Sequence, residues 1–196
     1  MPVTQSPTEQ ISALVADLRR IVNRRWWRWY TIWFGRGPWV VVSYRLDRAL
    51  FLLCGRAWVL LRPLFFPLFF LLDLLGGRAE IHYRAQIGPG LLILHSSLGV
   101  VVNGSAVVGR DLVLAGGNCI GLRGNESDTT LIIGDDVQLG VNAVVLGPVR
   151  VGDGARIGAG AVVVSDVDPG AFMIGVPAVR RPTGVAPNAE MGSVSR

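Results

Sequence analysis

Lysine is absent from this chain of 196 residues, and cysteine and histidine are scarce, with two residues each. Cys54 and Cys119 lie far apart in apolar surroundings, so no disulfide framework is predicted and a reducing compartment is favoured. The N-terminus lacks the order of a secretory signal peptide, and we expect a cytoplasmic protein. No cluster of metal ligands and no phosphate-binding glycine loop occurs in the sequence, so no metal site is predicted.

Aromatic residues are almost missing from the second part of the chain. Of the 16 Trp, Tyr and Phe residues, only Phe172 follows Tyr83, whereas 20 of the 25 glycines do. Residues 1–78 carry 11 Arg against 4 acidic residues, a net charge of +7, while residues 79–196 carry 8 Arg against 10 acidic residues, a net charge of −2. We therefore expect two parts that pack in different ways, with a boundary near residue 78.

A six-residue aliphatic period dominates the second part. It predicts a chain that winds as short strands around a prism, with one aliphatic side chain pointing inward on each face, because neither an α-helix nor an alternating strand has this period. Stacked hexapeptide coils of a parallel β-helix bury such a core. The inward positions, which shift by three residues between Ile93 and Val102, are Ile81, Ile87, Ile93, Val102, Val108, Leu114, Ile120, Ile133, Leu139, Val145, Val151, Ile157 and Val163.

The first part is predicted to be helical. Residues 9–23 have apolar side chains at helical spacing and predict an amphipathic helix, followed by a tryptophan-rich run that includes Trp26, Trp27 and Trp29. Two apolar stretches follow, 40–61 and 64–75, and neither reaches the roughly 18 uninterrupted apolar residues of a membrane-spanning helix. Two interpretations remain open: a helical subdomain that packs on the β-helix or on another subunit, and an interfacial anchor with aromatic and Arg side chains at anionic lipid. No nucleic-acid recognition motif accompanies the basic charge, so nucleic acid is not an expected partner.

The two histidines fall outside the inward register. His82 and His95 are therefore not predicted to be core residues. Glu80 precedes His95 by slightly less than the length of one coil, so the two side chains should flank one edge about 5 Å apart. A carboxylate beside an exposed imidazole supplies a general base with an orienting partner.

These residues carry a family resemblance. The segment AEIHYRAQIGPGLLILHSSLGVVVNGSAVVG, from residue 79, resembles the serine acetyltransferase group of hexapeptide-repeat transferases, and its initial Glu looks most like the bacterial exopolysaccharide (colanic acid) branch. ADLRRIV and VVSYRLDRALFLL are similar to the helical stretches of the family, GLRGNESDTTLIIGDD to its loop, and GARIGAGAVVVSDVDPGAFMIGVPA to its last coils.

The resemblance implies a left-handed parallel β-helix preceded by an N-terminal α-helical segment, a homotrimer, and acetyl-CoA bound between subunits. It makes His95 the catalytic base and Glu80 the acidic residue at the acceptor or base. Val141 and Ala159, with Gly160 beside them, would line the cofactor channel, and Arg123 would contact substrate or cofactor.

Departures from the family pattern bear on the acceptor. Serine acetyltransferases have Asp immediately before the catalytic His and a second His in the loop, where this chain has Leu94 and Thr130, and Gly116 stands where many relatives have His. We therefore expect O-acetylation of a sugar hydroxyl in surface polysaccharide assembly, with a lipid-linked precursor at the inner face of the plasma membrane as one form of the acceptor. Serine O-acetylation for cysteine synthesis is the first alternative, and a non-catalytic trimeric scaffold at the membrane is the second.

The expected organisation has three parts. Residues 1–78 form the basic, aromatic-rich helical segment, 79–168 the β-helix, and 169–196 an exit strap with a disordered tail.

Overall fold

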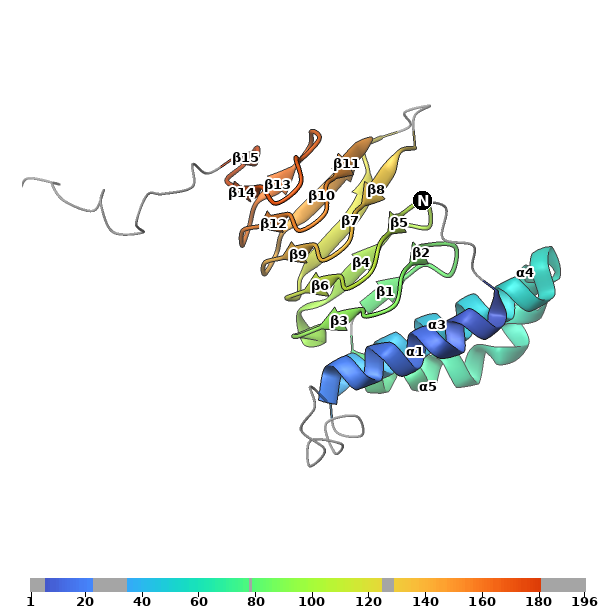
Figure 1. The fold of residues 1–196 in the computed structure, drawn as a ribbon. Coiled ribbons are helices and arrows are strands. Elements are labelled where there is room, and N and C mark those ends of the chain that lie inside the picture. The colour runs from blue at the N-terminus through green and yellow to red at the C-terminus, as the bar shows by residue number, and fades with distance from the viewer. Residues whose placement is uncertain (1–5, 23–34, 78, 125–128, 181–196) are drawn as a thin grey trace, which may run out of the picture.

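The computed structural model describes residues 6–22, 35–77, 79–124 and 129–180. Helices lie beneath one end of a stack of β coils (Figure 1). The helical elements are α1 (Pro7–Val22), α3 (Arg36–Cys54), the 3-10 turn η2 (Gly55–Ala57), α4 (Trp58–Leu61), the 3-10 turn η3 (Arg62–Phe65) and α5 (Phe66–Gly76). The predicted tryptophan-rich run and the predicted tail from residue 182 onward lie outside the described residues.

Short strands form the three faces of a prism. Parallel strands make up each sheet, in the orders β1-β4-β7-β10-β13, β11-β8-β5-β2 and β15-β14-β12-β9-β6-β3, except that β15 pairs antiparallel with β14. Their bounds are β1 (Ala79–Ile81), β2 (Gln86–Ile87), β3 (Leu92–Ile93), β4 (Val100–Val102), β5 (Val107–Val108), β6 (Val113–Leu114), β7 (Asn118–Leu122), β8 (Leu131–Ile133), β9 (Gln138–Leu139), β10 (Val144–Gly147), β11 (Val149–Val151), β12 (Arg156–Ile157), β13 (Val162–Val163), β14 (Phe172–Ile174) and β15 (Val179–Arg180).

The predicted inward register is confirmed in the core of the prism. Every predicted inward residue from Ile87 to Val163 is buried, and Ile81 packs at the margin of the same core. Small alanines at 85, 106, 143, 155 and 161 are fully buried at the turns. The prism continues beyond residue 168, because β14 pairs in parallel with β12.

The shift in the repeat is a local insertion at one corner. Glu80 pairs with Val101, and Val101 pairs in turn with Cys119, so the step from the first coil to the second is longer than the next step. The extra residues form the 3-10 turn η4 (Ser96–Leu98) between β3 and β4. The extra residues lie after His95, so they do not change the spacing between Glu80 and His95.

A buried ion pair fastens the helices to this first coil. Asp17 of α1 and Arg45 of α3 are almost fully buried, and Arg45 Nε lies 2.9 Å from Asp17 Oδ2. Asp17 Oδ1 also accepts hydrogen bonds from the backbone N–H groups of Gly90 (2.6 Å) and Leu91 (2.8 Å). Burial raises the pKa of the Asp17 carboxyl, and the charge of Arg45 acts against that shift. The network joins three segments that are distant in sequence.

The amphipathic helix is confirmed, but its buried side differs from the expected one. Gln10, Ala13 and Asp17 face the interior, whereas Ile11 and Val15 are exposed. The reason is the partner surface: Arg45 donates to Gln10 Oε1 and Asp17 and presents cationic nitrogens rather than aliphatic groups. Polar side chains therefore occupy the docking side of α1.

Helix α3 packs directly on the coil. Tyr44 donates its hydroxyl to the Ala85 carbonyl at 2.9 Å, and Arg45 donates to the carbonyls of Ile87 and Gly88, each at 2.7 Å. Arg48 donates to the carbonyls of Tyr83 (3.1 Å) and Arg84 (3.0 Å). Two arginines that the anchor interpretation would place at anionic lipid thus serve internal packing, which supports the subdomain interpretation for α3.

Residues 36–76 together satisfy the length and hydropathy expected of one membrane-spanning helix. Their most apolar window has a mean hydropathy of 1.9, and little of it is buried within the protein. The sequence predicts two separate apolar stretches, each too short for a span, and in the structure the chain turns at Gly55 so that α5 lies back along α3 (Figure 1).

Candidate active site

His95 occupies the corner of the prism where β3 ends and η4 begins. Its side chain is exposed, and its backbone N–H donates to the Ala115 carbonyl of the next coil at 3.2 Å. Gly116 lies against it with φ +125°, and a Cβ there would stand 2.5 Å from the His95 carbonyl oxygen. Glycine at 116 therefore allows the second coil to approach the His95 backbone closely.

The corners above His95 continue as a ladder of backbone hydrogen bonds. Gly117 donates to the Gly99 carbonyl at 2.6 Å, and Asn142 donates to the Gly116 carbonyl at 2.9 Å. The buried Asn118 side chain accepts from Gly116 N–H at 2.9 Å and donates to the Gly140 carbonyl at 2.8 Å. Asn118, for which the sequence gives no signal, fixes the turn directly above His95.

The predicted channel residues lie along the same edge of the prism. Val141 falls between β9 and β10, while Ala159 and Gly160 fall between β12 and β13. The Gly160 N–H donates to the Val141 carbonyl at 2.8 Å, which brings the two corners together. Ala159 and Gly160 are exposed, and a Cβ on Gly160 would meet open space. The structure thus places His95 and the three channel residues on one low, exposed edge.

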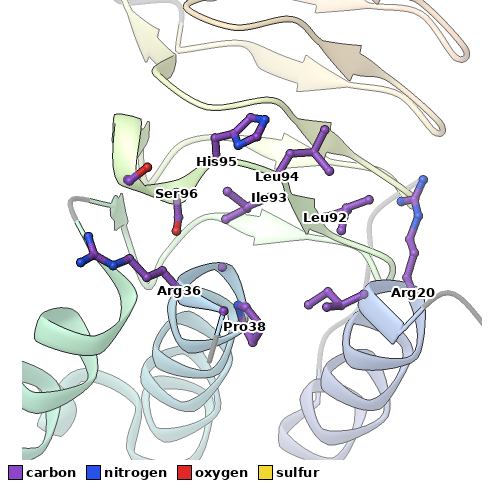
Figure 2. A pocket seen from close by; sticks show the side chains of 12 residues that line it. Arg20, Arg36, Pro38, Leu92, Ile93, Leu94, His95 and Ser96 are labelled. Atoms are coloured by element: carbon purple, nitrogen blue, oxygen red, sulfur yellow. The ribbon is translucent and has the colours of Figure 1, made fainter. Parts of the chain in front are cut away.

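A pocket of about 580 Å³ opens between His95 and the helices. Figure 2 shows His95 and Ser96 of the first coil on one side and Pro38 of α3 on the other, with Arg36 and Arg20 at opposite ends of the view. The lining residues are Arg20, Ile21, Gly35, Arg36, Gly37, Pro38, Leu92, Ile93, Leu94, His95, Ser96 and Ser97. Within the described part of the chain no carboxylate lines this pocket, so an anionic ligand group would meet only cationic and neutral side chains there.

Arg36 and Arg20 differ in what they bind. Arg20 hydrogen-bonds the Gly90 carbonyl and lies 3.3 Å from Asp111 Oδ1. Arg36 is exposed, and its guanidinium has no hydrogen-bond or ion-pair partner among the residues that the structure describes. Gly37 brings the start of α3 against the coil, because a Cβ at 37 would stand 2.8 Å from the Ile93 carbonyl oxygen. The sequence gives no sign of Arg36, since no local pattern pairs a helix start with a strand end.

The predicted stacking of Glu80 on His95 stays a prediction. The residue aligned above Glu80 is Val101, and the residue against His95 is Gly116. Glu80 lines a separate cavity of about 80 Å³ with Asp47, Asp73 and other residues. The insertion η4 follows His95, so the segment from Glu80 to His95 keeps the regular six-residue spacing of the coil.

Arg123 is remote from this edge within one chain. It follows β7, at the corner that leads to β8, whereas His95 lies at the corner between the β3 and β4 sheets. A role for Arg123 at the His95 pocket would require a second copy of the chain, and the assignments of Arg123 and Glu80 both remain predictions.

His82 has a structural setting. Its ring stacks on Tyr83 with centroids 4.4 Å apart, and Nδ1 accepts a hydrogen bond from Arg84 N–H at 3.1 Å. Burial, then the charges of Arg84 and Arg62, lower the pKa of His82. His82 therefore supports the first coil, and it does not line the His95 pocket.

Comparisons with known proteins agree on one enzyme type. Residues 131–165 match the family described as bacterial transferase hexapeptide (six repeats). A Mycobacterium tuberculosis serine acetyltransferase is 42% identical over 101 residues, which cover 50% of this chain and 43% of that protein. The structure of Neisseria gonorrhoeae serine acetyltransferase superimposes with a TM-score of 0.74 at 32% identity, covering 89% of this chain and 68% of that one. The same enzyme in complex with serine gives a TM-score of 0.74 at 31% identity, covering 89% of this chain and 70% of that one.

These findings correct the expected acceptor. The curated and solved relatives are serine acetyltransferases, so the prediction of a sugar hydroxyl in exopolysaccharide assembly is wrong, despite Leu94 and Thr130. Those two residues alone do not discriminate the acceptor. The predicted fold is confirmed, including the left-handed β-helix after a helical segment.

The chain matches only part of the length of its curated relatives. The chain spans less than two thirds of the curated relatives, 43% of the M. tuberculosis protein and 31% of a rice relative. It spans slightly more than two thirds of the solved N. gonorrhoeae structure. With that coverage, the shared fold and an identity of 32%, the chain belongs to the hexapeptide-repeat acyltransferases of the serine acetyltransferase type.

Proposed function

We propose that this protein transfers an acetyl group from acetyl-CoA to the hydroxyl of L-serine, with His95 as general base. The observation that carries the proposal is the exposed His95 beside a cationic pocket, on the same edge as the small residues Ala159 and Gly160. The similarity to serine acetyltransferases supports serine as the acceptor. A cytoplasmic location is proposed from the free Cys54 and Cys119.

His95 acts on the proton of the acceptor hydroxyl. An imidazole nitrogen takes that proton as the serine oxygen forms its bond to the thioester carbonyl carbon, and the carbon–sulfur bond then breaks. The proton passes from the imidazolium to the departing sulfur, which gives O-acetylserine and free CoA thiol. Acetyl-CoA supplies the acyl group, and no acyl-enzyme is required.

Arg36 provides the charge that recognises serine. Its guanidinium lacks a partner in the described residues and lines the pocket that contains His95. A guanidinium binds a carboxylate through two parallel N–H donors, so Arg36 would hold the α-carboxylate of serine. The positive end of α3, which begins at Arg36, adds to the same potential.

The low edge of the prism fits a thin donor arm. Val141, Ala159 and Gly160 would hold the donor, because small side chains leave space for it along this edge. The hydrogen bond from the Gly160 N–H to the Val141 carbonyl keeps the two corners together. We also propose a homotrimer in which this exposed edge meets a second copy, from which Arg123 would act, while Glu80 would contact the acceptor or His95.

The direct test is thiol release from acetyl-CoA. The purified full-length chain should release CoA with L-serine well above the rate without acceptor, and the product should be O-acetylserine by mass. Equal thiol release with and without serine, across a range of serine concentrations, would refute serine as the acceptor.

Arg36→Ala should raise the KM for L-serine by about 10- to 100-fold, the loss expected for one charge-assisted contact. The KM for acetyl-CoA should change little, because Arg36 lies in the acceptor pocket. Steady-state kinetics with both substrates measure the split, and Arg56→Ala, another exposed arginine, is the matched control.

L-serinamide separates the carboxylate contact from general damage. It retains the hydroxyl and amine but is not anionic, so the parent enzyme should use it poorly and Arg36→Ala should reduce that residual rate no further. An equal additional loss with both acceptors would mean that Arg36 does not bind the carboxylate.

A further inference from the structure

The helices beside the first coil expose a large apolar surface. In Figure 1, α5 lies alongside α3 beneath the β-helix, and α4 projects beyond it. We define the apolar face as the exposed large side chains of this region: Val59, Leu60, Leu64, Phe66, Leu68, Phe70, Leu71, Leu74 and Leu75. Soluble monomers rarely expose contiguous apolar patches beyond a few hundred Å². This face is therefore expected to be covered.

The apolar face wraps around α5 rather than forming a stripe. With about 100° per residue, its exposed positions cover an arc of about 200° that is bounded by Phe66 and Leu68. The buried positions Phe69, Leu72 and Gly76 occupy the narrower remainder that contacts the rest of the protein. So wide an apolar arc leaves little of α5 for contact with water, as is found for helices covered by protein or by lipid.

Charge is placed only at the margins of this face. Residues 63–72 include no charged side chain, and Asp73 lies at the edge of the arc, where it accepts a hydrogen bond from Ser43 at 3.5 Å. Exposed Arg56 and Arg62 precede the apolar run 63–72. This order of cationic and apolar groups complements an anionic membrane surface.

The contacts of α3 exclude a membrane-spanning arrangement. Arg45 and Arg48, near the middle of α3, are buried and donate to carbonyls of the first coil. These contacts hold α3 on the β-helix, and α5 alone has 11 residues where a span needs about 20. The helices can therefore lie on a bilayer but cannot cross it while the fold is kept.

We propose that the apolar face inserts into the interfacial region of an anionic phospholipid bilayer and holds the enzyme on the membrane surface. Phe66 and Phe70, which stack with ring centroids 5.8 Å apart, contribute two adjacent aromatic rings to the inserted surface. Arg56 contacts the headgroups, as does Arg62, which is half exposed although it also binds Asp47. The His95 pocket remains on the coil, so membrane binding is separate from the proposed acetyl transfer.

The test is co-sedimentation of the full-length chain with vesicles in which phosphatidylcholine and phosphatidylglycerol are mixed at a molar ratio of roughly two to one. The parent should bind these vesicles more tightly than pure phosphatidylcholine and should retain part of that binding at about 0.5 M NaCl, because insertion is not screened by salt. Failure to bind anionic vesicles at low salt, or complete loss of binding at high salt, would overturn insertion.

A pair of variants localises the contact. Phe70→Asp with Leu74→Asp should lower vesicle partitioning by about 100-fold, with the loss of two apolar side chains from the lipid. Ile11→Asp with Val179→Asp is the matched control, since these side chains are equally exposed on other surfaces. The control should bind as the parent does.

Measurements without lipid distinguish membrane binding from the competing possibility that a second copy of the chain covers the apolar face. Circular dichroism and serine acetylation should match the parent for both double variants, and sedimentation should show an unchanged oligomeric state. If Phe70→Asp with Leu74→Asp instead splits the oligomer in the absence of lipid, the apolar face is a contact between copies and the membrane proposal fails.

Discussion

His95→Ala should lower turnover with L-serine by about 100- to 10,000-fold, the range for loss of a positioned general base. The imidazole stands exposed at the edge of the pocket and makes no side-chain hydrogen bond within the described residues, so its removal should leave the fold intact. The affinity for acetyl-CoA, measured by calorimetry, should change little, because Val141, Ala159 and Gly160 lie on other corners.

His82→Ala is the matched control for this variant. His82 is the other histidine of the chain, and it packs against Tyr83 outside the pocket. Its loss should change turnover by no more than a few fold. If His95→Ala retained near-parental turnover while His82→Ala lost it, the assignment of the base would be wrong.

Asp17→Ala should destabilise the fold by about 3–5 kcal/mol, the cost of removing one partner of a buried ion pair. Arg45 is about 1% exposed and cannot release its proton, so the substitution leaves an uncompensated buried cation. It also leaves the Gly90 and Leu91 N–H groups without their acceptor. Denaturant unfolding followed by circular dichroism measures the change.

Two substitutions calibrate the effect of Asp17→Ala. Asp17→Asn keeps an oxygen acceptor for the backbone donors and should cost less. Asp111→Ala removes the partner of Arg20 from a largely exposed ion pair and should cost no more than about 1 kcal/mol. Equal losses for Asp17→Ala and Asp111→Ala would show that the buried network does not fasten α1 to the coil.

The helices are harder to predict than the prism, for a physical reason. A repeat places each inward residue by counting, so Ile87 or Val145 can be assigned from the sequence, and equivalent corners bring Val141 and Ala159 to one edge. Asp17 cannot be assigned in this way, because its partners lie 28 and 73 residues away and reverse the expected buried side of α1.

The site is predictable only in part, since its residues come from both kinds of structure. His95 is identifiable because it falls outside the inward register. The position of Glu80 beside it stays a prediction, and the 3-10 conformation of the insertion η4 has no signal in the repeat. Arg36 has no signal in the sequence, since it reaches the pocket only through the close contact of Gly37 with Ile93.

The most direct measurement of the central claim is the product formed from acetyl-labelled acetyl-CoA and L-serine. The parent enzyme should yield labelled O-acetylserine together with an equal amount of free CoA thiol, and His95→Ala should yield neither above background. Thiol release by the parent without labelled O-acetylserine, or equal yields from parent and His95→Ala, would contradict serine acetylation at the His95 pocket.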